Sequence, residues 1–220
     1  MNTSDTTPNV LLHWIVAGTA AMTAMLAWSV IAQDLRVLYE ENHLMEHLQL
    51  ALLALVTWAF WRSDWCEMDE AKQHQRRHLR WLAITATVLS ASFILREMSV
   101  KQSGIDWLIY FVDGFGFKLI MLVLWLPLLV NLLIHFREYW QLMKQAKHTR
   151  FFIFAMMSLA LLLVGAVFDK EVFKPEFFRF YEEAAELNAY AWLLASALSF
   201  QQDMVSVSDE NNRLSLATAQ

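Results

Sequence analysis

The sequence predicts an all-α fold, a polytopic membrane bundle of about six transmembrane helices. Hydrophobic residues make up 57% of the 220 residues, whereas charged residues make up only 18%. Soluble domains usually contain about 25% charged residues. The apolar residues also gather in six long segments. No stretch shows the sustained alternation of apolar and polar residues that predicts a half-buried strand, so we do not expect an all-β architecture.

The six segments account for most of the chain and are separated by short charged loops. A membrane-spanning helix needs about 20 residues. We therefore expect a single bundle over residues 1–200 and a polar, disordered tail over residues 201–220. The six segments are Leu11–Ala32, Leu44–Trp61, Leu79–Leu95, Leu119–Phe136, Phe151–Phe168 and Leu187–Phe200.

Taken in order, the segments differ in how readily they span a membrane. The first ten residues contain no Lys or Arg, so we interpret the first segment as a retained helix and not as a cleaved signal. The second, fourth and fifth segments are long enough as they stand. Pro127 lies inside the fourth and favours a kink there. The third and sixth reach spanning length only if they include charged residues at their outer ends, among them Arg96, Glu97 and Glu186.

The basic residues predict the orientation of these segments. Ten of the 17 Lys and Arg residues lie in the tail and in the two loops that follow the second and fourth segments. Lys and Arg are enriched in cytoplasmic loops. We therefore expect a bacterial inner-membrane protein with both termini in the cytoplasm.

Ionisable residues gather at the opposite, outer ends of the segments. His43, Glu46 and His47 are spaced i, i+3 and i+4, so they share one helical face. Glu183 and Glu186 are similarly spaced at the start of the sixth segment. Because carboxylates at membrane depth normally face the bundle and pair with cations, we expect an outward-facing pocket, with Arg96 and Lys118 as counter-ions. The alternative is interfacial capping, since acidic residues favour helix N-termini.

Histidines and carboxylates on one face indicate a divalent metal site, with Zn, Mn or Fe as the metals that suit such ligands. The residues His43 to His47 match the H-x-x-E-H pattern, in which two histidines bind zinc and the glutamate activates water. The candidate metal ligands are His43, Glu46, His47, Glu97, Asp169, Glu183 and Glu186. The candidate catalytic residues are Glu46, Glu97 and Asp113.

Other ligand classes have less support in the sequence. Residues Leu11 to Trp14 resemble the opening of the first helix in bacterial b-type cytochromes of the b561 kind. Haem needs two histidines at matching depth, and His135 is the only such partner for His13, so we do not expect haem. His74 and His78 repeat an H-x-x-x-H spacing on the inner side. The net charge of −5, without a basic stripe, predicts no nucleic-acid binding.

Four motif islands suggest a relationship to known proteins: ENHLMEHLQ from Glu41, FILREMS from Phe93, FDKE from Phe168 and EEAAEL from Glu182. Their order resembles a set of uncharacterised bacterial multi-pass proteins with acidic helix-end motifs. It is more distantly similar to the alkaline-ceramidase-like membrane hydrolases. That second resemblance implies a zinc bound by histidines with a Ser and an Asp nearby. No histidine follows His148, although that family has a late histidine pair.

Three functions therefore remain open from the sequence. The first is a metal-dependent hydrolase acting on membrane lipid, whose metal activates water. The second is a transporter coupled to protons or cations, in which the same carboxylates titrate. The third is an accessory or scaffold subunit that assembles with other membrane subunits.

Overall fold

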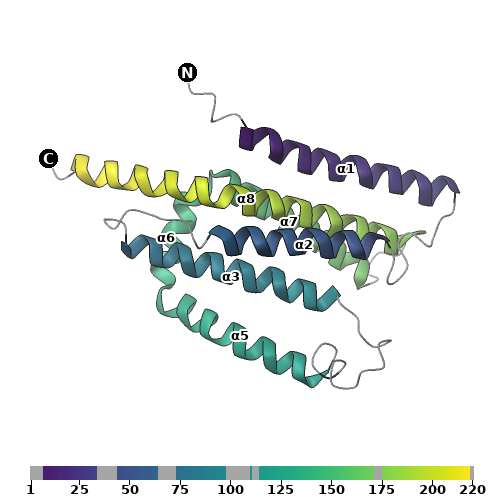
Figure 1. Ribbon diagram of the computed structural model, residues 1–220, viewed down its shortest axis with the longest axis horizontal. Helices are drawn as coiled ribbons and strands as arrows, with labels where there is room; N and C mark the ends of the chain where they lie inside the picture. Colours follow the sequence, from purple (N-terminus) through teal and green to yellow (C-terminus); the bar gives the residue numbers. More distant parts are fainter. Residues whose placement is uncertain are drawn as a thin grey trace. The chain divides into compact units, whose positions relative to one another are not determined.

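The computed structural model describes residues 7–33, 44–63, 73–97, 110, 114–170 and 175–218. These residues form seven α-helices and no β-strand, which confirms the predicted all-α class (Figure 1). The helices are α1 (Thr7–Gln33), α2 (Leu44–Ser63), α3 (Gln73–Glu97), α5 (Phe115–Ile134), α6 (Phe136–Ala146), α7 (Arg150–Asp169) and α8 (Phe178–Thr218).

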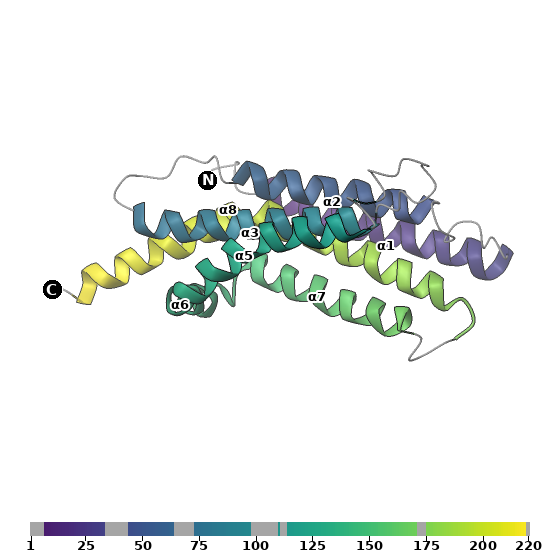
Figure 2. The ribbon, with the colours of Figure 1, turned by 90° about the horizontal axis from the view of Figure 1, so that it is seen from below.

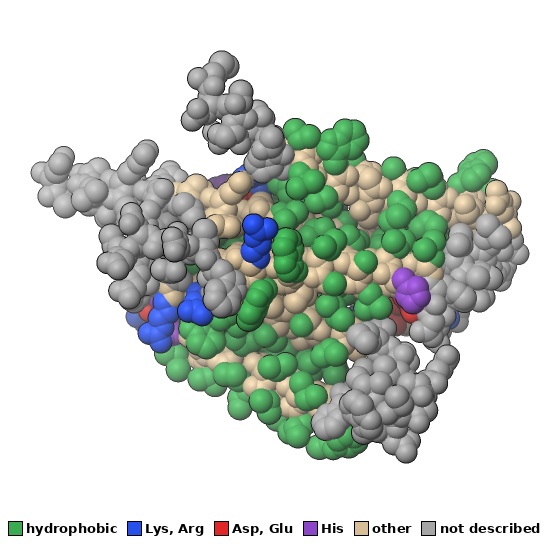
Figure 3. All heavy atoms as spheres, in the orientation of Figure 1, with side chains coloured by type: hydrophobic (Ala, Val, Ile, Leu, Met, Phe, Trp, Pro, Cys, Tyr) green, Lys and Arg blue, Asp and Glu red, His purple; other side chains and the backbone are tan. Residues whose placement is uncertain are grey.

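Five of the described helices, α1, α2, α3, α5 and α7, are long and apolar enough to cross a membrane. Their outward-facing side chains suit a lipid environment: Trp14 and Trp28 on α1 are 72% and 70% exposed. Along α5, at the lower edge of Figure 3, the visible side chains are almost all hydrophobic. Water would disfavour so much exposed apolar surface, whereas acyl chains do not. The chain is a multi-pass membrane protein.

The structure corrects three details of the predicted helices. The sixth predicted segment lies within α8, which has 41 residues and is not among the five apolar helices. Helix α8 continues to Thr218, well beyond the predicted end of the sixth segment at Phe200. The fourth predicted segment, Leu119–Phe136, ends early at Ile134, because His135 leaves the helical conformation with φ −105° and ψ 27°.

The chain divides into two compact units, which we describe separately. Unit 1 comprises residues 1–52 and 149–199, and unit 2 comprises residues 53–148 and 200–220. Helices α2 and α8 each contribute one part to each unit.

In unit 1, the first half of α8 is a buried helix surrounded by α1, α2 and α7. Leu187 on α8 packs with Leu26 and Val30 of α1 and with Met45 of α2. Asn188 Nδ2 donates to Thr23 Oγ1 of α1 at 2.8 Å, and Ser196 Oγ donates to the main-chain oxygen of Phe151 at 2.9 Å. Small and polar residues are common where membrane helices pack closely, because they allow close approach and hydrogen bonds between helices.

In unit 2, polar contacts join the helices in the same way. Thr57 Oγ1 donates to Ser90 Oγ at 3.0 Å, and the Trp125 indole donates to Ser92 Oγ at 3.2 Å. Helix α3 packs against α5. The chain turns sharply at His135: Figure 2 shows α6 almost end-on, whereas α5 runs across the picture.

Candidate functional site

A buried amide and a carboxylate meet where α2 and α8 pack together in unit 1. The side chain of Gln49 is fully buried. Its Nε2 donates to Glu183 Oε2 at 2.7 Å and to the Glu183 main-chain oxygen at 3.2 Å. Its Oε1 is also buried, with no hydrogen-bond partner among the described residues. Gln49 Oε1 is thus a buried acceptor without a hydrogen-bond donor among the described residues, on the side chain that contacts the Glu183 carboxylate.

Glu186 brings a second carboxylate to the same side of α8, three residues after Glu183. It is only 6% exposed. Gly165 of α7 makes the space for it: a Cβ on Gly165 would lie 3.2 Å from Glu186 Cγ. We call Gln49, Glu183 and Glu186 the acidic site.

The local sequence explains why these polar groups point inward. Helix α8 presents alanines 184, 185 and 189 around its carboxylates, and such small residues allow neighbouring helices to approach. An ionised or hydrogen-bonding group facing lipid is costly, so it turns toward the other helices. The next turn of α8 carries Tyr190, which is also fully buried.

The remaining predicted site residues of unit 1 lie nearer the helix ends. Glu46 and His47 occupy the first turn of α2, where Glu46 is half-buried and His47 is exposed. Asp169 ends α7 and is exposed, with Lys170 Nζ 3.4 Å from its Oδ2. An exposed pair of this kind contributes little to stability.

Several predicted residues lie in unit 2 or outside the described part. His43 and Asp113 lie outside the described residues, and Glu97 is described only as the last helical residue of α3. Arg96 on α3 and Lys118 on α5 are exposed in unit 2, and their role as counter-ions stays a prediction. Within the described ranges, no group of three or more His, Cys, Asp or Glu side chains is arranged to hold a metal ion.

Unit 2 contains an aromatic cluster that the sequence did not indicate. The ring of His78, which is buried, packs edge-on against His135 at 5.1 Å and against Tyr139 at 5.5 Å between centroids. His135 Nδ1 lies 4.0 Å from Glu138 Oε1. The sequence shows both histidines, but it suggested other partners for them, His74 for His78 and His13 for His135. Only the tertiary packing of α3 against the junction of α5 and α6 reveals this pairing.

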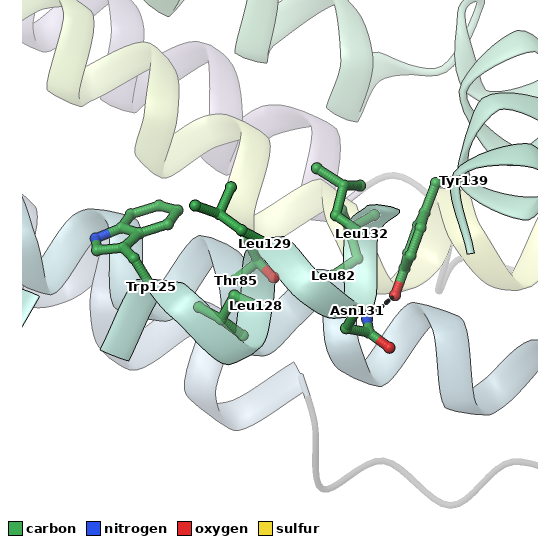
Figure 4. Close-up of a pocket in the computed structure, with 8 residues that line it drawn as sticks. All are labelled: Leu82, Thr85, Trp125, Leu128, Leu129, Asn131, Leu132 and Tyr139. Carbon is green, nitrogen blue, oxygen red and sulfur yellow. Dashed lines mark hydrogen bonds between the residues drawn. The ribbon is translucent and has the colours of Figure 1, made fainter. Parts of the chain in front are cut away.

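A small cavity of about 60 Å³ adjoins this cluster (Figure 4). It has room for one or a few water molecules. Asn131 Nδ2 donates to Tyr139 Oη at 2.7 Å at one end. Burial raises the pKa of Tyr139 above its ordinary value of 10.0, against a smaller opposing effect of that hydrogen bond. The lining residues are Leu82, Thr85, Trp125, Leu128, Leu129, Asn131, Leu132 and Tyr139.

Comparison of the chain with known protein families, with curated proteins and with solved structures found no match.

Proposed function

We propose that this chain is a multi-pass protein of the bacterial inner membrane that takes up and releases a proton or a small monovalent cation at the acidic site. The observation that carries this proposal is the fully buried Gln49, whose Oε1 has no hydrogen-bond partner among the described residues. A buried acceptor without a donor costs roughly 1–3 kcal/mol. A protonated carboxyl group, a hydronium ion or a sodium ion with its water would satisfy that oxygen.

The two carboxylates of the site favour the same ligand class. Glu183 accepts from Gln49, and Glu186 is almost completely buried one turn away. Ionised carboxylates within a bilayer are costly, and two neighbouring negative charges disfavour each other. Uptake of one positive charge lowers both costs, and its release restores them. Intramembrane carboxylates commonly serve proton and ion pathways for this reason.

The described residues favour cation coupling over a metal-dependent lipid hydrolase. A catalytic zinc needs three protein ligands and an open position for water. No three-ligand group is present among the described residues. The acidic site supplies carboxylate and amide oxygens instead, which suit protons and hard cations better than zinc.

The test is ion flux into liposomes that contain the purified full-length protein. A potassium diffusion potential drives protons inward, and a trapped pH dye reports their entry; labelled sodium is measured in parallel. We expect the wild type to conduct or exchange one of these ions. Glu186→Gln keeps the size and hydrogen-bonding capacity of the side chain but cannot bind or release a proton, so we expect the flux to be lost.

Glu176→Gln is the matched control, because Glu176 precedes α8 in the same unit and is exposed. It should retain the wild-type flux. Wild-type flux no greater than in empty liposomes, or equal flux in Glu186→Gln and wild type, would contradict the proposal. In that case, partners that co-purify with both proteins would indicate the scaffold function.

A further inference from the structure

Helix α6 connects two membrane-spanning helices but does not continue either of them. It begins at Phe136, immediately after α5 ends at Ile134. Figure 2 shows α6 almost end-on, whereas α5 of the same unit runs across the picture, so the two helices take different directions. Amphipathic helices that turn away from a spanning helix at its end are typical of the plane of the membrane interface.

The residues of α6 fall into distinct sectors around the helix axis. Phe136, Trp140 and Met143 are 56%, 45% and 45% exposed. At about 100° per residue they lie within about 60° of one another. Tyr139 and Ala146, on the adjoining sector, are less exposed, and the Tyr139 ring packs on His78 of unit 2. The exposed apolar sector is therefore not used by the packing of unit 2.

Two basic side chains border that apolar sector. Arg137 and Lys144 are exposed, and by the same helical spacing they lie on the flank of the sector away from Tyr139. Lys144 Nζ lies 5.5 Å from the centroid of the Trp140 ring, and that ring stacks on Phe136 at 6.2 Å with planes 17° apart. The acidic residue Glu138 is on a different sector, near His135. The border between the apolar and polar sectors thus carries positive charge.

We propose that α6 lies in the headgroup layer of a leaflet that contains anionic phospholipid. Phe136, Trp140 and Met143 enter the upper acyl region, and Arg137 and Lys144 contact lipid phosphates at the level of the glycerol backbone. Amphipathic helices with an aromatic apolar face and a basic flank bind membrane surfaces in this way. The positive charges of Arg137 and Lys144 favour anionic lipid over zwitterionic lipid. A partner protein is the competing occupant and is an outcome of the test.

The test places spin labels on α6 of the full-length protein in lipid nanodiscs. Cys66 is the only cysteine and is first replaced by serine. Met143→Cys then places a label on the apolar sector, and Gln141→Cys places one on the polar sector. Collision with oxygen reports acyl chains and collision with a water-soluble nickel complex reports solvent. We expect oxygen access at the first position and nickel access at the second, with the contrast larger in phosphatidylglycerol than in phosphatidylcholine.

The double variant Arg137→Gln/Lys144→Gln tests the contribution of the two positive charges. In this variant the contrast between the two labelled positions should be the same in phosphatidylglycerol and in phosphatidylcholine. Lys170→Gln/Arg179→Gln removes the same charge from exposed positions of unit 1 and should leave the contrast intact. Equal nickel access at both labelled positions in both lipids would overturn the proposal. Low access to both reagents at the Met143→Cys position would also overturn it, because it would indicate a protein surface on α6.

Discussion

Gly165 shows how a single residue determines what the acidic site can contain. A methyl group there would lie 3.2 Å from Glu186 Cγ, closer than about nine in ten Cβ contacts, whereas Gly18 on α1 has no atom within 4 Å of such a position. Both glycines lie inside membrane helices, so alanine brings a similar gain in helix propensity of up to about 1 kcal/mol at either position. Only Gly165→Ala adds a steric cost.

We therefore expect Gly165→Ala to be less stable than Gly18→Ala by about 1–3 kcal/mol, the usual cost of overpacking. Unfolding of the two variants in mixed micelles of detergent and dodecyl sulfate measures that difference. The same Gly165→Ala protein should show reduced ion flux, because Glu186 must shift. Equal stabilities for the two variants would mean that the space beside Gly165 is not filled by Glu186.

The buried phenol of Tyr139 predicts how stability changes with pH in alkaline solution. Its folded-state pKa is raised above 10.0, mainly by burial. The folded state therefore favours the neutral phenol, and this contribution to stability is present below pH 10 and is lost as the pH rises through the folded pKa. A difference absorbance titration between the wild type and Tyr139→Phe should give a midpoint above pH 10. A midpoint at or below 10 would contradict the burial of this ring.

The sequence identified part of the acidic site, and physical reasons explain which part. Glu186 was found because an acidic residue among apolar neighbours in a membrane helix must face inward. Gln49 was not among the candidate site residues, since a neutral amide gives no charge signal and its role depends on contact with Glu183 from a distant helix. The cluster of His78 with His135 escaped detection for the same reason.

At the scale of the elements, the hydrogen bond between Asn188 of α8 and Thr23 of α1 connects two helices of unit 1. A double-mutant cycle with Asn188→Ala and Thr23→Val measures it. We expect a coupling energy of about 0.6 kcal/mol and at most about 1.7 kcal/mol, the mean and the maximum found for hydrogen bonds between membrane helices. Ser29→Ala provides the comparison, because Ser29 donates only to Met25 within α1, and its effect should add to that of Asn188→Ala.

The five apolar helices were predicted within a few residues in most cases, because their composition alone requires burial in lipid or protein. Helix α6 was missed because its apolar residues recur once per turn and form no continuous run. The predicted segment Leu187–Phe200 covers only about a third of helix α8. Its polar residues are tolerated only because α1, α2 and α7 shield them, and a single segment does not contain that information.

At the scale of the whole molecule, the number of crossings determines the side on which the C-terminus lies. If α8 crosses in addition to the five apolar helices, both termini are cytoplasmic, as the basic loops predict. A fluorescent protein fused after Gln220 should then fold and fluoresce, and alkaline phosphatase at the same position should stay inactive. The opposite pattern would show that α8 does not cross.

Labelling of Tyr110, which precedes α5 in the sequence, gives an independent check of this topology. In a Cys66→Ser/Tyr110→Cys protein, a membrane-impermeant maleimide should react in spheroplasts without lysis. In the wild type, Cys66 should react only after lysis, because its loop carries the cytoplasmic set of basic residues. Reaction of the native cysteine in intact spheroplasts would reverse the assigned orientation.

The burial of α8 also has a consequence for biogenesis. The translocon admits helices to lipid according to their hydrophobicity, and carboxylates at the centre of a segment oppose entry. Helix α8 holds Glu183 and Glu186, and it is synthesised after the other helices that the structure describes. If α8 crosses, we therefore expect it to insert after the earlier helices have integrated, since α1, α2 and α7 surround its polar residues. Chains truncated before Phe178 should persist as incomplete bundles with an unfilled polar groove, which membrane proteases recognise and degrade.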